Sequence, residues 1–260
     1  MCSHFLSFLL LAALPCLAEG TGIFRVCADP NNMPFSNEAG QGFENKLAEL
    51  MAAKLNAKLE YTWWSQRKSF VRNSLDEGKC DALMGVPSAL DSVSATRPYY
   101  RSTYVFVTRR ERHLHIVSLT DERLARLRIG IHVVGDDYAP PAFALARRGI
   151  TQNISGFSLF GEYGEMNPAR KIVDAVDRGE IEVAIVWGPF AGYFSQTAKS
   201  PLDIEPVSPP IFLGVPFTYD ISIGVRKGNE ELKNRLNDLL QSESAAVQQI
   251  LAQYDVPEVH

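Results

Sequence analysis

The sequence predicts an α/β protein with two lobes, each a mostly parallel sheet flanked by helices. Strand-like and helix-like segments alternate along the chain, and the alternation starts afresh near residue 113. Strand, helix, strand order is typical of parallel sheets joined by right-handed crossovers. A chain of 260 residues is also long enough for two lobes near the common domain size.

The first half of the pattern predicts one lobe. A strand is expected at 24–28, and helical spacing of apolar residues follows from 43 to 55. Further strands are expected at 58–63, 82–86 and 104–108, with a short helix over 66–77 that Gly78 ends.

The second half repeats the alternation. Strands are expected at 129–133 and 183–186, with helices over 139–148, 168–179 and 190–198. A strand at 221–225 and two terminal helices then return to the first lobe. We therefore expect a signal peptide at 1–18, lobe one at 19–108, lobe two at 109–212 and a return to lobe one at 213–260. The two hinge crossings are expected near 108–112 and 208–214.

The amino-terminal segment predicts export. Residues 5–14 are apolar, and Cys16-Leu17-Ala18 permits cleavage before Glu19. Pro15 occupies the position where a lipoprotein needs a small residue. No later stretch approaches the ~18 uninterrupted apolar residues of a membrane helix. We expect a cleaved, periplasmic protein that is monomeric and not inserted in a membrane.

Charge and cysteine content narrow the class further. A net charge of −4 argues against a nucleic-acid partner, which needs a basic stripe. Export and cleavage leave Cys27 and Cys80, which in an oxidising compartment predict a disulfide worth roughly 4 kcal/mol. The alternative is two buried free thiols.

Candidate binding residues follow the ends of the predicted strands. In open parallel sheets, ligands bind beyond the carboxyl ends of the strands, so two facing lobes gather these residues around one cleft. For Trp64 and Trp187 the alternative is a place in the core of a lobe. Tyr99 and Tyr100 are neighbours in a strand and point to opposite faces, so at most one of them can face the cleft. Phe217 can pack either into the cleft or into a core. The candidate cleft residues are Asn31, Asn32, Pro34, Phe35, Trp64, Arg67, Pro87, Tyr99, Asp136, Asp137, Trp187, Pro189 and Phe217.

No motif indicates catalysis, a metal or a cofactor. His113 and His115 on a charged connector are better explained as surface residues than as metal ligands. Nucleotide-binding loops, hydrolase elbows and zinc-protease motifs are missing from the sequence. Glu162 and Glu165 are the nearest candidates for a catalytic acid, and a loop at the cleft rim is the simpler interpretation. We expect no enzyme activity and no cofactor.

Several strings resemble a known family. Asn31-Asn32-Met33-Pro34-Phe35, Gly42-Phe43-Glu44 and the stretches at 80–85 and 97–102 resemble family 3 periplasmic solute-binding proteins. The strings at 25–32, 61–64, 85–87 and 216–222 resemble the MoxJ/XoxJ group within that family, found with PQQ-dependent methanol dehydrogenases. The resemblance implies a type II periplasmic-binding-protein fold and an accessory role in maturation of a quinoprotein alcohol dehydrogenase involved in methanol oxidation.

The sequence departs from the amino-acid receptors of this family. Those receptors hold the ligand carboxylate with an arginine after the third strand and the ammonium with an aspartate in the second lobe. Here the stretch 87–91 has no arginine, and Trp187-Gly188 stands in place of the aspartate. Losing both charge-assisted contacts predicts roughly 10²- to 10⁴-fold weaker amino-acid binding.

Three functions follow from these observations. The favoured one is a non-catalytic accessory protein that holds a protein segment or apolar ligand in or at its cleft. The second is an ABC-transporter substrate-binding protein for a small solute other than a standard amino acid. The third is an enzyme on the same fold, such as a dehydratase, which would need a cleft acid with a raised pKa.

Overall fold

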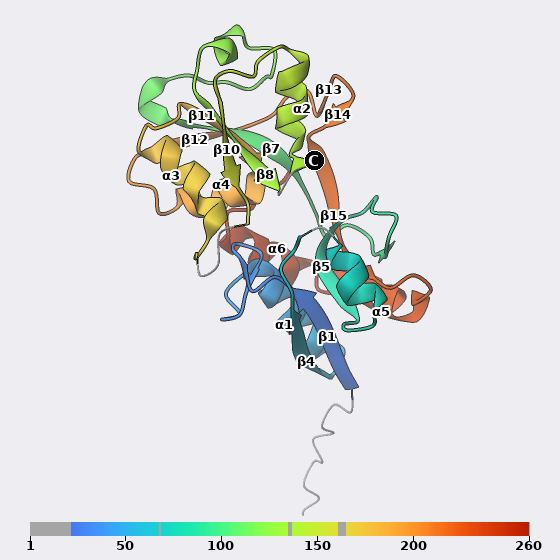
Figure 1. Cartoon of the computed structure of the whole chain (residues 1–260). Coiled ribbons are helices and arrows are strands. Elements are labelled where there is room, and N and C mark those ends of the chain that lie inside the picture. The colour runs from blue at the N-terminus through green and yellow to red at the C-terminus, as the bar shows by residue number, and fades with distance from the viewer. Residues whose placement is uncertain (1–21, 68, 135–136, 161–164, 260) are drawn as a thin grey trace, which may run out of the picture.

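Two lobes make up the protein (Figure 1). The computed structural model describes residues 22–67, 69–134, 137–160 and 165–259, with the backbone alone at 137 and 138. The expected signal peptide at 1–18 lies outside these residues. Within them, no helix is long and apolar enough to cross a membrane.

The first lobe contains a three-stranded parallel sheet core. β1 (Gly22–Ala28) lies between β4 (Ala57–Trp63) and β5 (Ala82–Pro87) and pairs in parallel with both. The accompanying helices are α1 (Phe43–Lys54), α5 (Glu230–Ser242) and α6 (Ser244–Gln253), with the minor strands β2 (Asn31–Asn32), β3 (Ser36–Asn37) and β6 (Ser94–Ala95).

The second lobe repeats this architecture. β8 (Ile129–Val134) pairs in parallel with β10 (Ile154–Ser158) and β11 (Val183–Trp187). Its other elements are α2 (Pro140–Arg147), α3 (Lys171–Asp177), α4 (Gly188–Ser195), β9 (Asp137–Tyr138), β12 (Leu202–Pro206), and the hairpin of β13 (Ile211–Phe212) and β14 (Val215–Pro216). The predicted α/β fold with two mostly parallel halves is confirmed.

Two strands join the lobes. β7 (Tyr100–Arg109) pairs with β15 (Thr218–Val225) over Tyr100–Thr103, and with β11 from Tyr104 onward. The whole sheet therefore runs β10-β8-β11-β7-β15-β5-β1-β4, continuous through the waist. From this pairing we propose that the lobes meet near residues 103–104 and 217–218, a few residues from the 109 and 212 expected from sequence.

One predicted helix is different in the structure. In place of a regular helix over 66–77, the chain forms a short π-helical turn at Arg72–Asp76. Ser69 has a positive φ of 70°, and the Ser74 hydroxyl donates a hydrogen bond to the Phe70 carbonyl at 2.5 Å. Serine side chains compete in this way with the backbone pattern of a regular helix.

The start of α1 is fixed by close packing and positions the site. Asn45 Oδ1 accepts hydrogen bonds from the Gly42 and Asn37 amides, both at 3.0 Å. A Cβ at Gly42 would lie 2.0 Å from the Phe35 carbonyl oxygen, so only glycine fits this position. The first turn of α1 is thereby held against the loop after β1.

The predicted disulfide is confirmed. Cys27 at the end of β1 and Cys80 just before β5 are bonded, with their Cα atoms 5.5 Å apart. Both residues are buried in a small apolar cluster with Phe70, Leu75 and Leu83.

Candidate functional site: the cleft between the lobes

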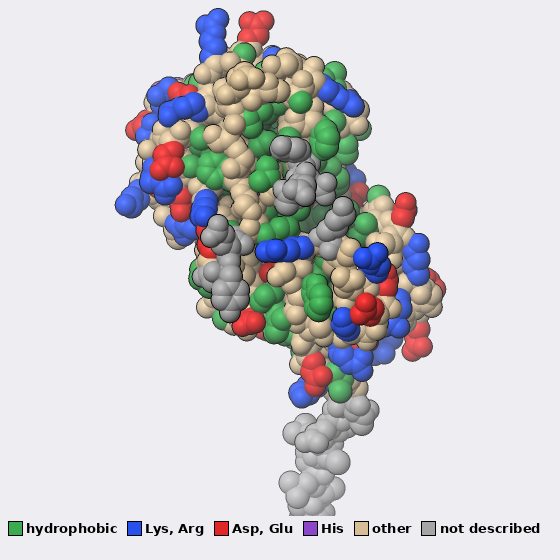
Figure 2. All heavy atoms as spheres, viewed as in Figure 1, with side chains coloured by type: hydrophobic (Ala, Val, Ile, Leu, Met, Phe, Trp, Pro, Cys, Tyr) green, Lys and Arg blue, Asp and Glu red, His purple; other side chains and the backbone are tan. Residues whose placement is uncertain are grey.

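A cavity of about 420 Å³ lies between the two lobes. Figure 2 shows hydrophobic side chains on both lobes around the waist of the molecule. Both lobes contribute to its lining, which consists of Asn32, Phe35, Glu44, Gln66, Gly85, Pro87, Tyr100, Tyr104, Val134, Pro140, Leu159, Phe160, Trp187, Phe190, Tyr219 and Ile221. Its volume falls in the range of small-molecule sites.

Strand ends supply much of this lining, as the topology predicts. Pro87, Val134 and Trp187 are the last residues of β5, β8 and β11. The carboxyl ends of parallel strands meet at one edge of a sheet, so each lobe presents these residues toward the other.

The joining strands supply an aromatic floor. Trp187 is paired in register with Tyr104, and Ile221 with Tyr100, so these side chains are cross-strand neighbours. The Trp187 ring lies 5.5 Å from the Tyr104 ring and 5.8 Å from the Tyr219 ring, both edge to face. Such contacts hold the indole in one orientation.

Phenylalanine rings close the opposite wall. Phe35 of the first lobe lies 5.1 Å from Phe190 of the second, centroid to centroid. Phe35 also contacts Phe43, the first residue of α1. The lobes thus touch through an edge-to-face aromatic contact as well as enclosing the cavity.

Glu44 is the single ionisable acid or base among the described lining residues, the tyrosines aside. Its carboxylate lies over Gly85, where an added Cβ would be 1.8 Å from Oε1. Burial raises the pKa of Glu44 to about 8. Burial, and then the nearby Glu44 carboxylate, raise the pKa of Tyr100 well above its usual value. In the described part of the chain, no side chain forms an ion pair or hydrogen bond with the Glu44 carboxylate.

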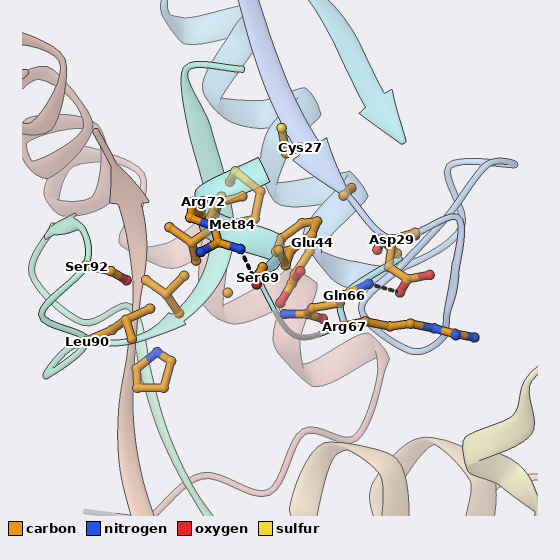
Figure 3. Close-up of a pocket in the computed structure, with 18 of the residues that line it drawn as sticks. Cys27, Asp29, Glu44, Gln66, Arg67, Ser69, Arg72, Met84, Leu90 and Ser92 are labelled. Atoms are coloured by element: carbon orange, nitrogen blue, oxygen red, sulfur yellow. Dashed lines mark hydrogen bonds between the residues drawn. The ribbon is translucent and has the colours of Figure 1, made fainter. Parts of the chain in front are cut away.

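A second pocket, of about 410 Å³, adjoins the cavity within the first lobe (Figure 3). Glu44, Gln66, Gly85 and Pro87 line both. Two hydrogen bonds are drawn in Figure 3. The Arg72 guanidinium donates to the Ser69 hydroxyl at 3.1 Å, and the backbone amide of Gln66 donates to the Asp29 carboxylate at 2.6 Å. Arg72 and Asp29 of this pocket are therefore already engaged, whereas Glu44 has no such partner among the residues described.

Some sequence-predicted residues do line a cavity. Asn32, Phe35, Pro87 and Trp187 line the space between the lobes. Arg67 lines the adjoining pocket, and its guanidinium carbon lies 5.8 Å from the Phe160 ring of the second lobe. Asp136 lies outside the described residues; Asp137 is in β9, and its side chain is likewise outside them.

Other predicted residues do not line the cavity. Pro34 is buried, and its carbonyl accepts a hydrogen bond from the Phe43 amide at 2.8 Å. Pro189 is buried in the first turn of α4, and Phe217 is fully buried in the core of the second lobe. In each case the side chain packs inside one lobe and does not reach the cleft.

Three more predictions need correction. Tyr99 is buried and donates its hydroxyl to the Met84 carbonyl at 2.8 Å, so Tyr100 is the tyrosine that faces the cavity. Trp64 is 40% exposed outside the cavity, with the Lys79 ammonium 4.6 Å from its ring. Asn31 contacts the second lobe instead of the cavity, through the Glu165 carbonyl.

Glu44 was the main residue missed from sequence. It follows Gly42-Phe43 at the start of a predicted helix, and the local pattern indicates a helix start there and not a cleft residue. Phe190 follows a predicted strand end and Tyr219 follows the predicted return crossing, and both line the cavity. Gln66, Tyr104 and Phe160 were also missed. Their only signal was proximity to predicted strand ends or hinge crossings.

The family match decides the class of protein. Residues 24–255 match the family described as bacterial extracellular solute-binding proteins, family 3. The chain belongs to this family. Its two lobes, joining strands and central cavity are the architecture that such a protein uses to enclose a solute.

Two curated relatives that span most of the chain share the name Protein MoxJ. The chain is 30% identical to Protein MoxJ of Paracoccus denitrificans over 258 residues, covering 95% of this chain and 93% of that one. It is 29% identical over 250 residues to Protein MoxJ of Methylorubrum extorquens, covering 91% and 81%. The resemblance of the sequence to the MoxJ/XoxJ group is confirmed.

Solved structures of the MoxJ/XoxJ group have the same fold as this chain. The periplasmic binding protein XoxJ from Methylobacterium extorquens superposes with a TM-score of 0.75 at 34% identity, covering 91% of this chain and 99% of that one. MxaJ from Methlophaga aminisulfidivorans superposes with a TM-score of 0.80 at 25% identity, covering 91% and 100%. An ancestral cationic amino-acid solute-binding protein, 19% identical with a TM-score of 0.68, shares the fold.

No cluster of three or more metal-ligating side chains occurs among the residues that the structure describes. The solute-binding family and the shape of the cleft both indicate binding as the role of this site.

Proposed function

We propose that this protein is a periplasmic, non-catalytic accessory partner of a PQQ-dependent methanol or alcohol dehydrogenase. In this proposal the cleft, or its rim, holds a segment of the dehydrogenase or an apolar ligand during maturation. The observation that carries the proposal is the composition of the cleft: seven aromatic side chains line it, and the described lining contains no lysine or arginine.

This composition argues against ordinary amino-acid capture. A free amino acid needs a cation for its carboxylate as well as an anion for its ammonium, and each charge-assisted contact is worth ~1.5–3 kcal/mol. Arg67 and Arg72 line the adjoining pocket, and Arg72 donates to Ser69. The cleft itself offers large apolar rings, which favour an apolar segment or ligand.

The resemblance to MoxJ and XoxJ supports the choice of partner. The similarity extends over nearly the whole of each relative, so the cleft and both lobes belong to the compared region. The MoxJ/XoxJ group is found with quinoprotein dehydrogenases, which suggests the same association for this chain.

A second candidate is an ABC-transporter substrate-binding protein for a small solute other than a standard amino acid. A volume of about 420 Å³ favours it, because that space suits a small molecule better than a folded segment. The two candidates share the cleft and differ in what enters it and in the partner that docks outside.

The test is co-purification of the protein with the dehydrogenase of its host, combined with gene deletion. Deletion is expected to lower the PQQ content and activity of the dehydrogenase, and the wild-type gene to restore both. Trp187→Ala, which removes the centre of the aromatic floor, should fail to restore them. Trp64→Ala is the matched control, because Trp64 lies outside the cavity. Normal PQQ loading in the deletion strain would contradict the proposal.

A further inference from the structure

We propose that the cavity between the lobes binds an organic ammonium cation, with its charge on the Glu44 carboxylate and its alkyl groups against the surrounding aromatic rings. This inference rests on the cleft being a ligand site, which both candidate functions share. It adds the chemical class of the ligand, and it does not depend on which partner protein docks.

Glu44 has no partner among the residues that the structure describes. It is the second residue of α1, and packing of Gly42 against the Phe35 carbonyl fixes its position. Its carboxylate occupies the space over Gly85, where a side chain would collide with it. No described lysine, arginine or histidine forms an ion pair with it, and no described donor bonds to it. An acid in a largely apolar cavity is destabilising unless something pairs with it.

Aromatic rings surround this acid in the cavity lining. Seven rings line the cavity: those of Phe35, Tyr100, Tyr104, Phe160, Trp187, Phe190 and Tyr219. The faces of aromatic rings carry negative potential, and aromatic cages attract alkylated ammonium groups more strongly than neutral groups of the same shape. An unpaired acid beside such rings has the composition of a site for a cation, whereas a site for an anion needs the opposite charge.

The other charged groups that the structure describes near the cavity form neither ion pairs nor hydrogen bonds with the Glu44 carboxylate. Arg72 donates to Ser69, Asp29 accepts from the Gln66 amide, and the Arg67 guanidinium lies against the Phe160 ring. Asp76 lines only the adjoining pocket. Burial raises the pKa of the Tyr99, Tyr100, Tyr104 and Tyr219 hydroxyls, and burial lowers the pKa of His132 to about 4. Between pH 5 and 9 the four tyrosine hydroxyls and the His132 ring therefore stay uncharged, and Glu44 is the cavity group that titrates.

This gives the site a proton-linked affinity. Burial raises the pKa of Glu44 to about 8, so the empty site holds a proton near neutral pH. A bound cation favours the ionised form and expels that proton. The Kd of a cation should therefore fall about tenfold per pH unit between pH 5 and 8 and level off above pH 8. A neutral ligand that accepts a hydrogen bond from protonated Glu44 would show weaker binding above pH 8.

The experiment is calorimetric titration of the purified protein with choline and with 3,3-dimethylbutan-1-ol, its uncharged isostere, from pH 5 to 9. Choline should bind at least tenfold more tightly than the alcohol at pH 8.5, with proton release near neutral pH. Glu44→Gln should abolish the difference. Glu49→Gln, on the exposed face of the same helix, should preserve it. Thermal unfolding and circular dichroism of both variants show whether they fold.

A lysine derivative with blocked backbone groups distinguishes the sources of the cation. Tighter binding of choline supports a free solute, and tighter binding of the lysine derivative supports a side chain of a partner protein. Equal binding of choline and the alcohol, or no binding of either cation at about 10 mM, would overturn the inference. Loss of dehydrogenase association with choline binding intact would overturn only the proposed function.

Discussion

Asn31 of the first lobe holds the second lobe through two hydrogen bonds. Its Nδ2 donates to the Glu165 carbonyl at 2.6 Å, and its Oδ1 accepts from the Asn167 amide at 3.1 Å. The two bonds bring β2 against the segment that precedes the helical turn at Pro168–Arg170. Because both bonds join one lobe to the other, they stabilise the arrangement of the lobes in this structure.

Asn31→Ala is expected to favour an open arrangement. Each hydrogen bond contributes about 0.5–1.5 kcal/mol net, so losing both should raise the open population on the order of tenfold. Small-angle scattering of the variant should give a larger radius of gyration than that of the wild type. Asn32→Ala is the matched control, because Asn32 bonds to Gln66 of its own lobe at 2.9 Å. Equal radii for the Asn31 variant and the wild type would contradict this role.

Glu44 is expected to make folding stability fall as pH rises. Its pKa is raised from an ordinary 4.5 to about 8, so the folded protein holds the proton more tightly than the unfolded chain does. The stabilisation from that proton is complete below about pH 4.5 and is lost as pH rises through 8. Glu44→Gln should therefore be more stable than the wild type at pH 8 by roughly 2–4 kcal/mol, and equal to it near pH 4.

Urea unfolding at pH 4, 6 and 8 measures this difference. The amide cannot ionise, so subtracting the two stability curves isolates the Glu44 contribution. Glu49→Gln should leave the pH dependence unchanged, since Glu49 is exposed and paired with Lys46. A stability difference that does not change with pH would refute the assignment.

His132 is expected to limit stability on the acid side. It is buried, with Nε2 3.1 Å from the Ala169 carbonyl and its ring 5.1 Å from Phe190. Burial lowers its pKa from 6.5 to about 4, so the unfolded chain takes up a proton first as pH falls. Stability should decline by about 3 kcal/mol between pH 6.5 and 4.

His132→Gln keeps a donor for the Ala169 carbonyl and removes the titration. Its unfolding free energy should change less than that of the wild type between pH 7 and 4. His113→Gln is the control, since His113 is exposed. An acid limb of equal depth in the wild type and in His132→Gln would exclude His132 as its cause.

The Cys27–Cys80 disulfide is expected to contribute about 4 kcal/mol to the unfolding free energy, because the bond closes a long loop in the unfolded chain. The double variant Cys27→Ala, Cys80→Ala should unfold at lower urea concentration than the oxidised wild type. Reductant should lower the midpoint of the wild type and leave that of the variant unchanged. Titration of two reactive thiols in the native, unreduced protein would rule out the bond.

Much of the fold follows from local sequence. Apolar spacing alone predicts α1, and short β-rich runs predict β1, β4, β5, β8 and β11. Strand ends then point to Phe35, Pro87 and Trp187, because the carboxyl edge of a parallel sheet is where side chains leave the core. Pairing of the two cysteines could be predicted because the chain is expected to be exported to an oxidising compartment.

Tertiary packing decided which side of each strand faces the cleft. Neighbouring strand residues such as Tyr99 and Tyr100 point to opposite faces, but sequence does not say which face the lobes enclose. In the structure the Met84 carbonyl takes the Tyr99 hydroxyl, and Tyr100 faces the cavity. Phe217 was ambiguous for the same reason, and the second-lobe core buries it.

The sequence by itself therefore determined the two-lobed fold and the aromatic character of the cleft, since these depend on residue type and on periods of two and 3.6 residues. It favoured a disulfide over two free thiols, and the structure contains the bond. Only the tertiary structure decided that Glu44 enters the cleft with no partner among the described residues, and that Asn31 ties the lobes together. Both facts depend on segments far apart in the chain: α1 against β5 for Glu44, and β2 against residues 165–167 for Asn31.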